Sequence, residues 1–259
     1  MSKLLPALLV LGLFAGPLSA QINESDTLLL QYHTSLTGSW QTGNLDAVSL
    51  RAKADISLAP SAAWAFKTQN AYRYQAFYDR KADHDFAGRN FIYLWPRRRI
   101  YPFVLFFPSA NYRRKIDFRQ FGGAGVSVQL LRQPGQTIKI SLSGVYETTH
   151  FAGSTYNDAD YDGHERIDTW RATLWLFGKH RLFNSRVRAF YEAFFQPSLG
   201  KAGNFRWQAE ASLEWPLWKG FSFTANYLFT HENVVISAVK PDDGLLTFGL
   251  AWNAKLAQP

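Results

Sequence analysis

The sequence predicts an all-β fold, an antiparallel transmembrane β-barrel of about 12 strands that follows a cleaved N-terminal signal peptide. Apolar and polar residues alternate with a period of two along most of the chain, and 16% of the residues are Phe, Trp or Tyr. The connections between the alternating segments are short and long in turn. A helix turns by about 100° per residue and would scatter this pattern, whereas a strand separates it onto two faces.

The first 20 residues have the pattern of a secretory signal peptide. Lys3 supplies a positive charge, residues 4–18 are almost wholly apolar, and small residues precede a cleavage point after Ala20. The apolar run contains Pro6 and Pro17 and is shorter than the roughly 17–25 residues of a membrane-spanning helix, which is the alternative. We expect residues 1–20 to be removed and residues 21–259 to form one outer-membrane barrel, with a short tail at 253–259.

The alternation divides the chain into segments of strand length. In one of them Ile138, Ile140 and Leu142 alternate with Lys139 and Ser141. Prolines make the segments 88–95 and 100–109 the least regular. We expect strands near residues 28–41, 45–58, 63–78, 88–95, 100–109, 116–131, 136–151, 166–180, 185–197, 204–215, 220–233 and 244–254.

Two classes of connection lie between these segments. The short ones are residues 59–62, 96–99, 132–135, 181–184 and 216–219, and the alternate ones, mostly longer, are residues 79–87, 110–115, 152–165, 198–203 and 236–243. Outer-membrane barrels have short periplasmic turns and long external loops. The pattern therefore predicts that both termini are periplasmic.

A soluble periplasmic sandwich or lipocalin-like barrel would show the same periodicity, with its apolar face inward. Side-chain size favours the membrane barrel, because bulky aromatic residues stand near the predicted strand ends, where interfacial girdles lie. These residues are Trp40, Trp64, Trp170, Trp207, Trp215, Phe221 and Trp252.

Composition limits the chemistry and the partners. The chain has no cysteine, which excludes disulfides, thiolate metal sites and an N-terminal lipid anchor. The chain has 28 basic and 20 acidic residues. One basic residue, Lys3, is removed with the signal peptide, so the mature chain has 27 basic and 20 acidic residues. For an exported protein we expect outer-membrane lipid, anionic lipopolysaccharide and the barrel-assembly machinery as partners, and no nucleic acid.

The predicted inner face carries most of the charge. Nine basic and five acidic residues fall on it: Arg51, Lys53, Lys67, Arg73, Lys139, Arg171, Arg186, Arg188 and Arg206 with Asp55, Glu147, Glu192, Glu210 and Glu214. The favoured interpretation is a salt-bridged ladder that fills and stabilises the lumen. The alternative is a narrow channel for small anionic solutes. A barrel of about 12 strands lies between the filled and the open sizes, so its size leaves both possible.

Two short motifs could carry chemistry. Asp158, Asp160 and Asp162 repeat the first half of a calcium loop, but the closing glutamate position is Thr169, so a solvated acidic loop is the favoured interpretation and a divalent cation the alternative. His33 and Ser35 share a strand face as a base and a nucleophile would, but no third orienting group is evident. We expect no enzyme activity and no other cofactor.

Three glycine-containing segments carry a family resemblance. They are residues 36–44, which end in Thr-Gly-Asn, then Tyr72-Arg73-Tyr74, and then Phe121-Gly122-Gly123-Ala124-Gly125-Val126. In this order they resemble the salt-induced outer-membrane protein family, also known as domain of unknown function 481, over roughly residues 28–252. The resemblance implies an outer-membrane barrel of unassigned activity and transfers no catalytic residues.

Overall fold

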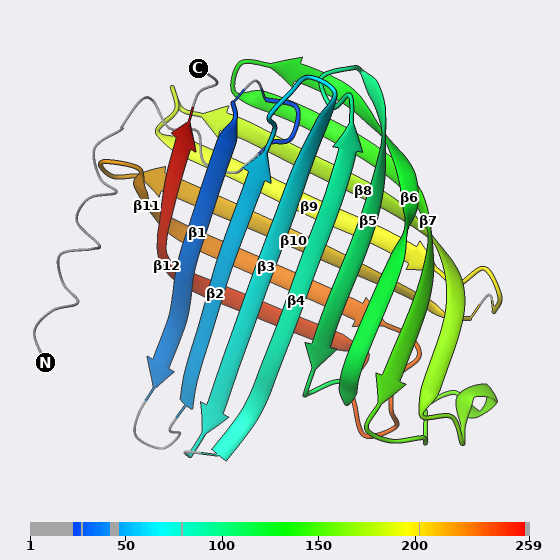
Figure 1. Ribbon diagram of the computed structural model, residues 1–259. Helices are drawn as coiled ribbons and strands as arrows, with labels where there is room; N and C mark the ends of the chain where they lie inside the picture. The colour runs from blue at the N-terminus through cyan, green and yellow to red at the C-terminus, as the bar shows by residue number, and fades with distance from the viewer. Residues whose placement is uncertain (1–22, 27, 42–46, 79, 202, 257–259) are drawn as a thin grey trace, which may run out of the picture.

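A computed structural model describes residues 23–26, 28–41, 47–78, 80–201 and 203–256. The expected signal peptide and the end of the tail lie outside these residues. The described chain forms a closed antiparallel barrel of 12 strands (Figure 1). The strands are β1 (Leu30–Gln41), β2 (Ala47–Leu58), β3 (Trp64–Phe77), β4 (Arg80–Leu94), β5 (Ile100–Asn111), β6 (Ile116–Gln133), β7 (Gln136–Phe151), β8 (Arg166–Leu182), β9 (Val187–Pro197), β10 (Phe205–Pro216), β11 (Phe221–Glu232) and β12 (Asp242–Leu256).

The first and last strands close the barrel. β1 pairs with β12 from Leu30 opposite Leu256 to Gly38 opposite Phe248, and each other strand pairs with its neighbours in the chain. Closure leaves no strand edge unpaired, which is the condition for a sheet to lie in hydrocarbon. The predicted fold class and strand number are therefore confirmed. No helix among the described residues is both long and apolar enough to cross a membrane.

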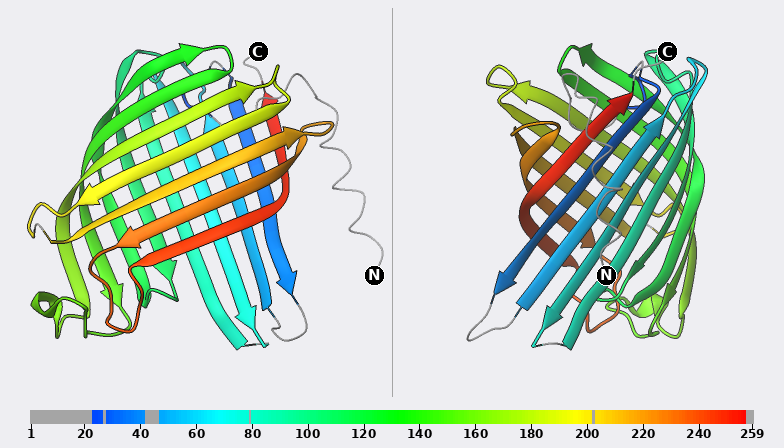
Figure 2. Two further views of the ribbon diagram at one scale, coloured as in Figure 1. Left: turned by 180° about the vertical axis from the view of Figure 1, so that it is seen from behind. Right: turned by 60° about the vertical axis from the view of Figure 1, so that its left-hand side comes forward.

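The two ends of the barrel differ, as expected from the connections. We call the end with the short turns, where β1 begins and β12 ends, the turn end, and the opposite end the loop end; they lie at the top and bottom of Figure 1. The long connections predicted at residues 152–165, 198–203 and 236–243 are confirmed at the loop end, where the structure has residues 152–165, 198–204 and 233–241 between strands. The left view of Figure 2 shows them together at the lower left.

One predicted loop is wrong. Residues 79–87 were expected to be an external loop, but β4 already begins at Arg80. The segment is polar because it lies near the loop end, where a strand needs no apolar face, and because Asp85 points inward to form an ion pair with Arg73. A polar strand end and a loop have similar composition.

The outer face is apolar and the register is the expected one. On β7, Leu142 is 60% exposed, whereas the Ser141 hydroxyl lies 2.7 Å from that of Ser127 on the inner face. Trp64, Trp170, Trp207 and Trp215 are also exposed on the outside, near the strand ends. The side chain of Trp40 lies outside the described set.

A cluster of mostly aromatic residues lies inside the barrel, on the face that the alternation predicts to be polar. Its buried members are Phe91, Tyr93, Tyr101, Phe103, Leu105, Phe107, Phe121, Val145 and Trp175. β5 is therefore apolar on both faces, because Val104 and Phe106 are exposed outside. This explains the apolar run at residues 101–107 and the weak alternation there.

The glycines of β6 make room for this cluster. A Cβ on Gly123 would lie 2.0 Å from the Gly144 carbonyl oxygen, and one on Gly125 would lie 2.8 Å from the ring of Phe103. Only glycine fits where two backbones and an aromatic ring approach so closely. Gly123 and Gly125 of the Gly-Gly-Ala-Gly motif are thus a packing requirement of the barrel wall.

Candidate functional site: the charged lumen

Most of the predicted lumen residues do lie inside the barrel. Ten are buried: Arg51, Asp55, Lys67, Arg73, Lys139, Glu147, Arg171, Arg188, Arg206 and Glu214. Lys53, Glu192 and Glu210 are half-buried. The prediction for Arg186 is wrong, because this residue is exposed in the turn before β9 and does not line the lumen. The alternation was extended one residue too far, into a turn where side chains no longer alternate.

Ion pairs cross the lumen at its middle. Glu192 and Glu210 stand directly opposite each other in the ladder between β9 and β10. Glu192 binds Arg89 of β4, on the other side of the barrel. Glu210 accepts hydrogen bonds from Lys53 Nζ at 2.7 Å and Arg51 Nη2 at 3.1 Å, both on β2. The two acidic groups are therefore neutralised from the opposite wall.

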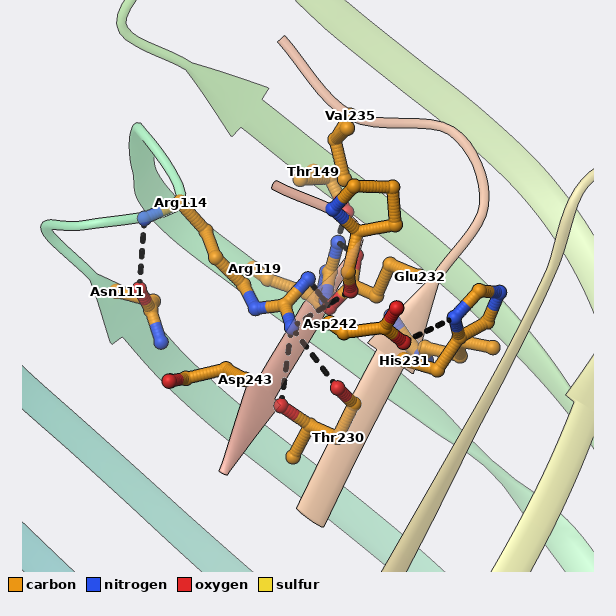
Figure 3. A network of polar contacts seen from close by, with 12 residues as sticks. Asn111, Arg114, Arg119, Thr149, Thr230, His231, Glu232, Val235, Asp242 and Asp243 are labelled. Carbon is orange, nitrogen blue, oxygen red and sulfur yellow. Dashed lines mark hydrogen bonds and ion pairs between the residues drawn. The ribbon is translucent and has the colours of Figure 1, made fainter. Parts of the chain in front are cut away.

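A second set of ion pairs lies nearer the loop end. Glu147 of β7 binds Arg206 and lies 3.2 Å from Arg171 Nε, with Arg119 Nε at 3.7 Å. Arg119 also makes a bidentate pair with Glu232 of β11, in which both N–O distances are 2.8 Å (Figure 3). Paired geometry of this kind is needed to compensate for the removal of these charges from water.

Arg114 ties the β5–β6 turn to the far wall. Its Nη2 donates to the Thr230 hydroxyl at 2.9 Å and to the Pro241 carbonyl at 3.1 Å (Figure 3). Its backbone N–H donates to Asn111 Oδ1 at 2.8 Å. This buried side chain thereby holds β11 and the end of the β11–β12 loop against the β5–β6 turn.

Two loops cover part of the loop end. We call residues 152–165 and 233–241 the loop cap. Val235 N–H donates to Asn157 Oδ1 at 2.9 Å, and Asn157 N–H donates to the Val235 carbonyl at 3.0 Å. The loop cap also encloses a buried apolar cluster, to which both loops contribute. Its members are Ile116, Phe151, Tyr156, Tyr161, Val234 and Ile236. Burial, and to a lesser extent the nearby charge of Glu165, raises the pKa of Tyr156 to about 12. The Tyr156 hydroxyl therefore stays protonated and donates a hydrogen bond to the His164 carbonyl.

Residues 23–26, which we call the N-terminal segment, enter the lumen at the turn end. Glu24 is 2% exposed there. Its Oε1 accepts hydrogen bonds from Lys139 Nζ at 2.5 Å and the Tyr101 hydroxyl at 2.7 Å. Burial alone would raise the pKa of Glu24. The positive charges of Lys139 and, to a lesser extent, Lys67 outweigh this effect and lower the pKa to about 2.

A cavity of about 240 Å³ remains between these layers of charge. Its polar wall includes Arg51, Lys53 and Glu210, and its apolar wall includes Phe107 and Phe194. Every one of these three charged groups already has an oppositely charged partner. The cavity can hold water or a small solute.

The three loop aspartates do not converge. Asp158 accepts from Asp160 N–H, Asp162 accepts from Tyr156 N–H at 2.7 Å, and the exposed Asp160 lies 3.4 Å from Lys201. No three His, Asp or Glu side chains among the described residues are grouped as a metal site requires. The divalent cation therefore stays a prediction from the sequence.

His33 has the orienting neighbours that sequence reasoning missed. Its Nδ1 lies 2.8 Å from Asn253 Oδ1, and its Nε2 lies 3.9 Å from Glu214. However, no hydrogen bond joins His33 to Ser35 in the described chain, and both face the inside of the barrel. The nucleophile and its base are therefore not assembled.

Several lumen charges were missed for identifiable reasons. Arg119 lies an even number of residues before Ser127 and Gln129 on the inner face of β6, so strict counting would have found it. Arg89 is hidden because Phe91 and Tyr93, the next inward residues, are aromatic. Glu24 precedes the first strand and belongs to no periodic pattern.

A closed barrel with an apolar exterior and an ion-paired interior is the architecture of bacterial outer-membrane β-barrels. Within this class, the chain belongs to the family described as protein of unknown function, DUF481, which matches residues 34–253.

Solved structures resemble this chain at low sequence identity. The NanC porin is 9% identical, with 85% of this chain and 98% of that chain covered and a TM-score of 0.50. The translocator domain of the autotransporter NalP from Neisseria meningitidis is 10% identical, with 86% of each chain covered and a TM-score of 0.44. Comparison with curated proteins gives no significant match.

Proposed function

We propose that this protein is an integral outer-membrane barrel with both termini on the periplasmic side and a lumen closed by ion pairs. In this proposal its role is structural or stress-responsive, and it is neither an enzyme nor an open channel. Outer-membrane lipid and lipopolysaccharide surround it, and the barrel-assembly machinery inserts it. The start of β1 and the end of β12 lie beside the short turns, which supports this orientation.

The observation that carries the proposal is the pairing across the middle of the lumen. Glu192 and Glu210 bind cations of β4 and β2 instead of lining an open passage. The N-terminal segment and the loop cap add obstructions toward the two ends. An anion-preferring pore would instead present basic groups that are free to exchange partners with a passing solute.

Conductance in planar lipid bilayers tests the closed lumen. The purified wild-type protein should add little current to the protein-free bilayer. The double variant Arg89→Ala/Glu192→Ala removes one cross-lumen pair without leaving an unpaired charge, and it should raise the conductance. The matched control is Lys201→Ala/Asp160→Ala, an exposed pair at the loop end, which should not. A large, anion-selective current through the wild-type protein would contradict the proposal and favour a channel.

A further inference from the structure

The Glu24 carboxylate occupies a niche built from three strands. Lys139 of β7 and Tyr101 of β5 bind its Oε1, and Lys67 Nζ of β3 lies 3.8 Å from its Oε2. All three side chains are buried, at 4% to 5% exposure for the lysines and 0% for Tyr101. Two ammonium groups and a phenol therefore converge on a single carboxylate in a nearly dry site.

The niche would be unfavourable without an anion. The two lysines share the ring of Phe177, with Lys139 Nζ 4.5 Å and Lys67 Nζ 5.6 Å from its centroid. Cation–π contacts stabilise ammonium groups only partly, and two buried like charges repel each other. An anion between them is the group that this arrangement requires.

The chain's own glutamate fills the niche imperfectly. Glu24 Oε2 is buried, yet it accepts no hydrogen bond from any described residue. The backbone around Glu24 is held by other contacts, since Asn23 and Gln31 exchange two hydrogen bonds of 2.9 and 2.7 Å and Arg132 donates to the Ser25 carbonyl at 2.9 Å. These contacts limit how far the Glu24 carboxylate can turn toward Lys67. A carboxylate that is not tethered could reach both lysines.

We propose that Lys67, Lys139 and Tyr101 form a binding site for small carboxylate anions inside the lumen, which Glu24 occupies as a tethered ligand. The walls of the remaining space, about 50 Å³, include Phe91, Phe103, Trp175 and Phe177. They suit a short aliphatic tail, so a small monocarboxylate such as propionate fits better than an inorganic anion. The site lies within the closed lumen proposed above, but its test does not depend on closure.

Chemical rescue of a Glu24→Ala variant tests the site. Removal of the side chain leaves two buried lysines without their carboxylate, so the thermal unfolding temperature of the full-length protein in detergent should fall. Propionate should restore it at about tenfold lower concentration than the neutral propionamide, because a hydrogen bond to a charged acceptor exceeds one to a neutral acceptor by about 1.4 kcal/mol. Chloride at equal ionic strength should have no such effect. Glu165→Ala, at the exposed end of the loop cap, is the matched control and should be neither destabilised nor rescued.

A further variant covers the case in which Glu24→Ala does not fold. Glu24→Ala/Lys67→Met/Lys139→Met removes all three charges together, so it should fold, unfold near the wild-type temperature and gain nothing from propionate. Equal rescue by propionate and propionamide, or a triple variant no more stable than Glu24→Ala, would overturn the proposal. Conductance of the wild-type protein is a separate measurement, so an open lumen would refute the proposed function and leave this result intact.

Discussion

At the scale of single residues, the central feature is a pair of carboxylates placed side by side. Glu192 and Glu210 face each other across β9 and β10, where like charges destabilise a sheet. Arg89, Arg51 and Lys53 compensate from the opposite wall. The ion pairs therefore act as cross-links between walls, and each glutamate is paired with strands far away in the sequence.

The substitution Glu210→Gln should destabilise the barrel by about 1.5–3 kcal/mol, because Lys53 and Arg51 lose a charged acceptor in a half-buried site. Any residual conductance should shift toward anions. Urea unfolding in lipid vesicles, followed by tryptophan fluorescence, measures the stability. The exposed Glu165→Gln is the control, and equal midpoints for the two variants would show that the cross-lumen pair contributes nothing.

Glu24 should make stability depend on pH in the acid range. Its folded-state pKa of about 2 lies below the ordinary value of 4.5, so its contribution is present above pH 4.5 and is lost as the pH falls toward 2. The groups that face it are Lys139, Lys67, Tyr101 and Tyr93. Glu24→Gln should therefore unfold at a lower temperature than the wild type at pH 6, and the difference should shrink toward pH 2. A difference that is constant with pH would refute this assignment.

Sequence reasoning placed charges on the inner face but could not place their partners. Neighbouring strands supply one pair of the predicted salt-bridged ladder, Arg188 with Glu214 at 3.6 Å. Glu210 instead takes its cations from β2 across the lumen, not from the neighbouring strand β9. Pairing between neighbours follows from alternation and turn length, whereas pairing across the lumen depends on how the whole barrel closes.

At the scale of strands, alternation predicts register well where one face is polar. β7 follows the expected pattern from Ile138 to Ser143. β5 does not, because its inner face packs in the aromatic cluster, and Pro108 interrupts its ladder with β4 between the pairs Ala87–Ser109 and Asn90–Phe106. A strand that is apolar on both faces carries no period-two signal, so only its length and its neighbours identify it.

Adjacent substitutions on β7 test the register directly. Leu142→Arg places a charge on the outer face and should cost about 2–4 kcal/mol near the middle of the bilayer. Ser141→Arg points into the polar lumen and should cost less. Unfolding of both variants in lipid vesicles gives the comparison. Equal costs, or a reversed order, would mean that the strand faces are assigned wrongly by one residue.

At the scale of the whole molecule, closure of the sheet gives the barrel its resistance to unfolding. The β1–β12 ladder satisfies the last free backbone groups, so the sheet has no edge from which it can open. Ion pairs at several levels then join opposite walls. Local opening of a strand such as β4 or β10 must therefore break both a ladder and a charged contact across the lumen.

We expect the folded protein to resist SDS at room temperature and to migrate differently after boiling. Backbone hydrogen bonds in a closed barrel are protected from the detergent until heat opens the sheet. Gel electrophoresis of unboiled and boiled samples measures the shift, and the protein should be recovered in the outer-membrane fraction. A variant truncated before Gly244 lacks most of β12, cannot close, and should migrate identically in both samples. Identical migration of the wild type, together with recovery in the soluble periplasmic fraction, would contradict insertion in the membrane.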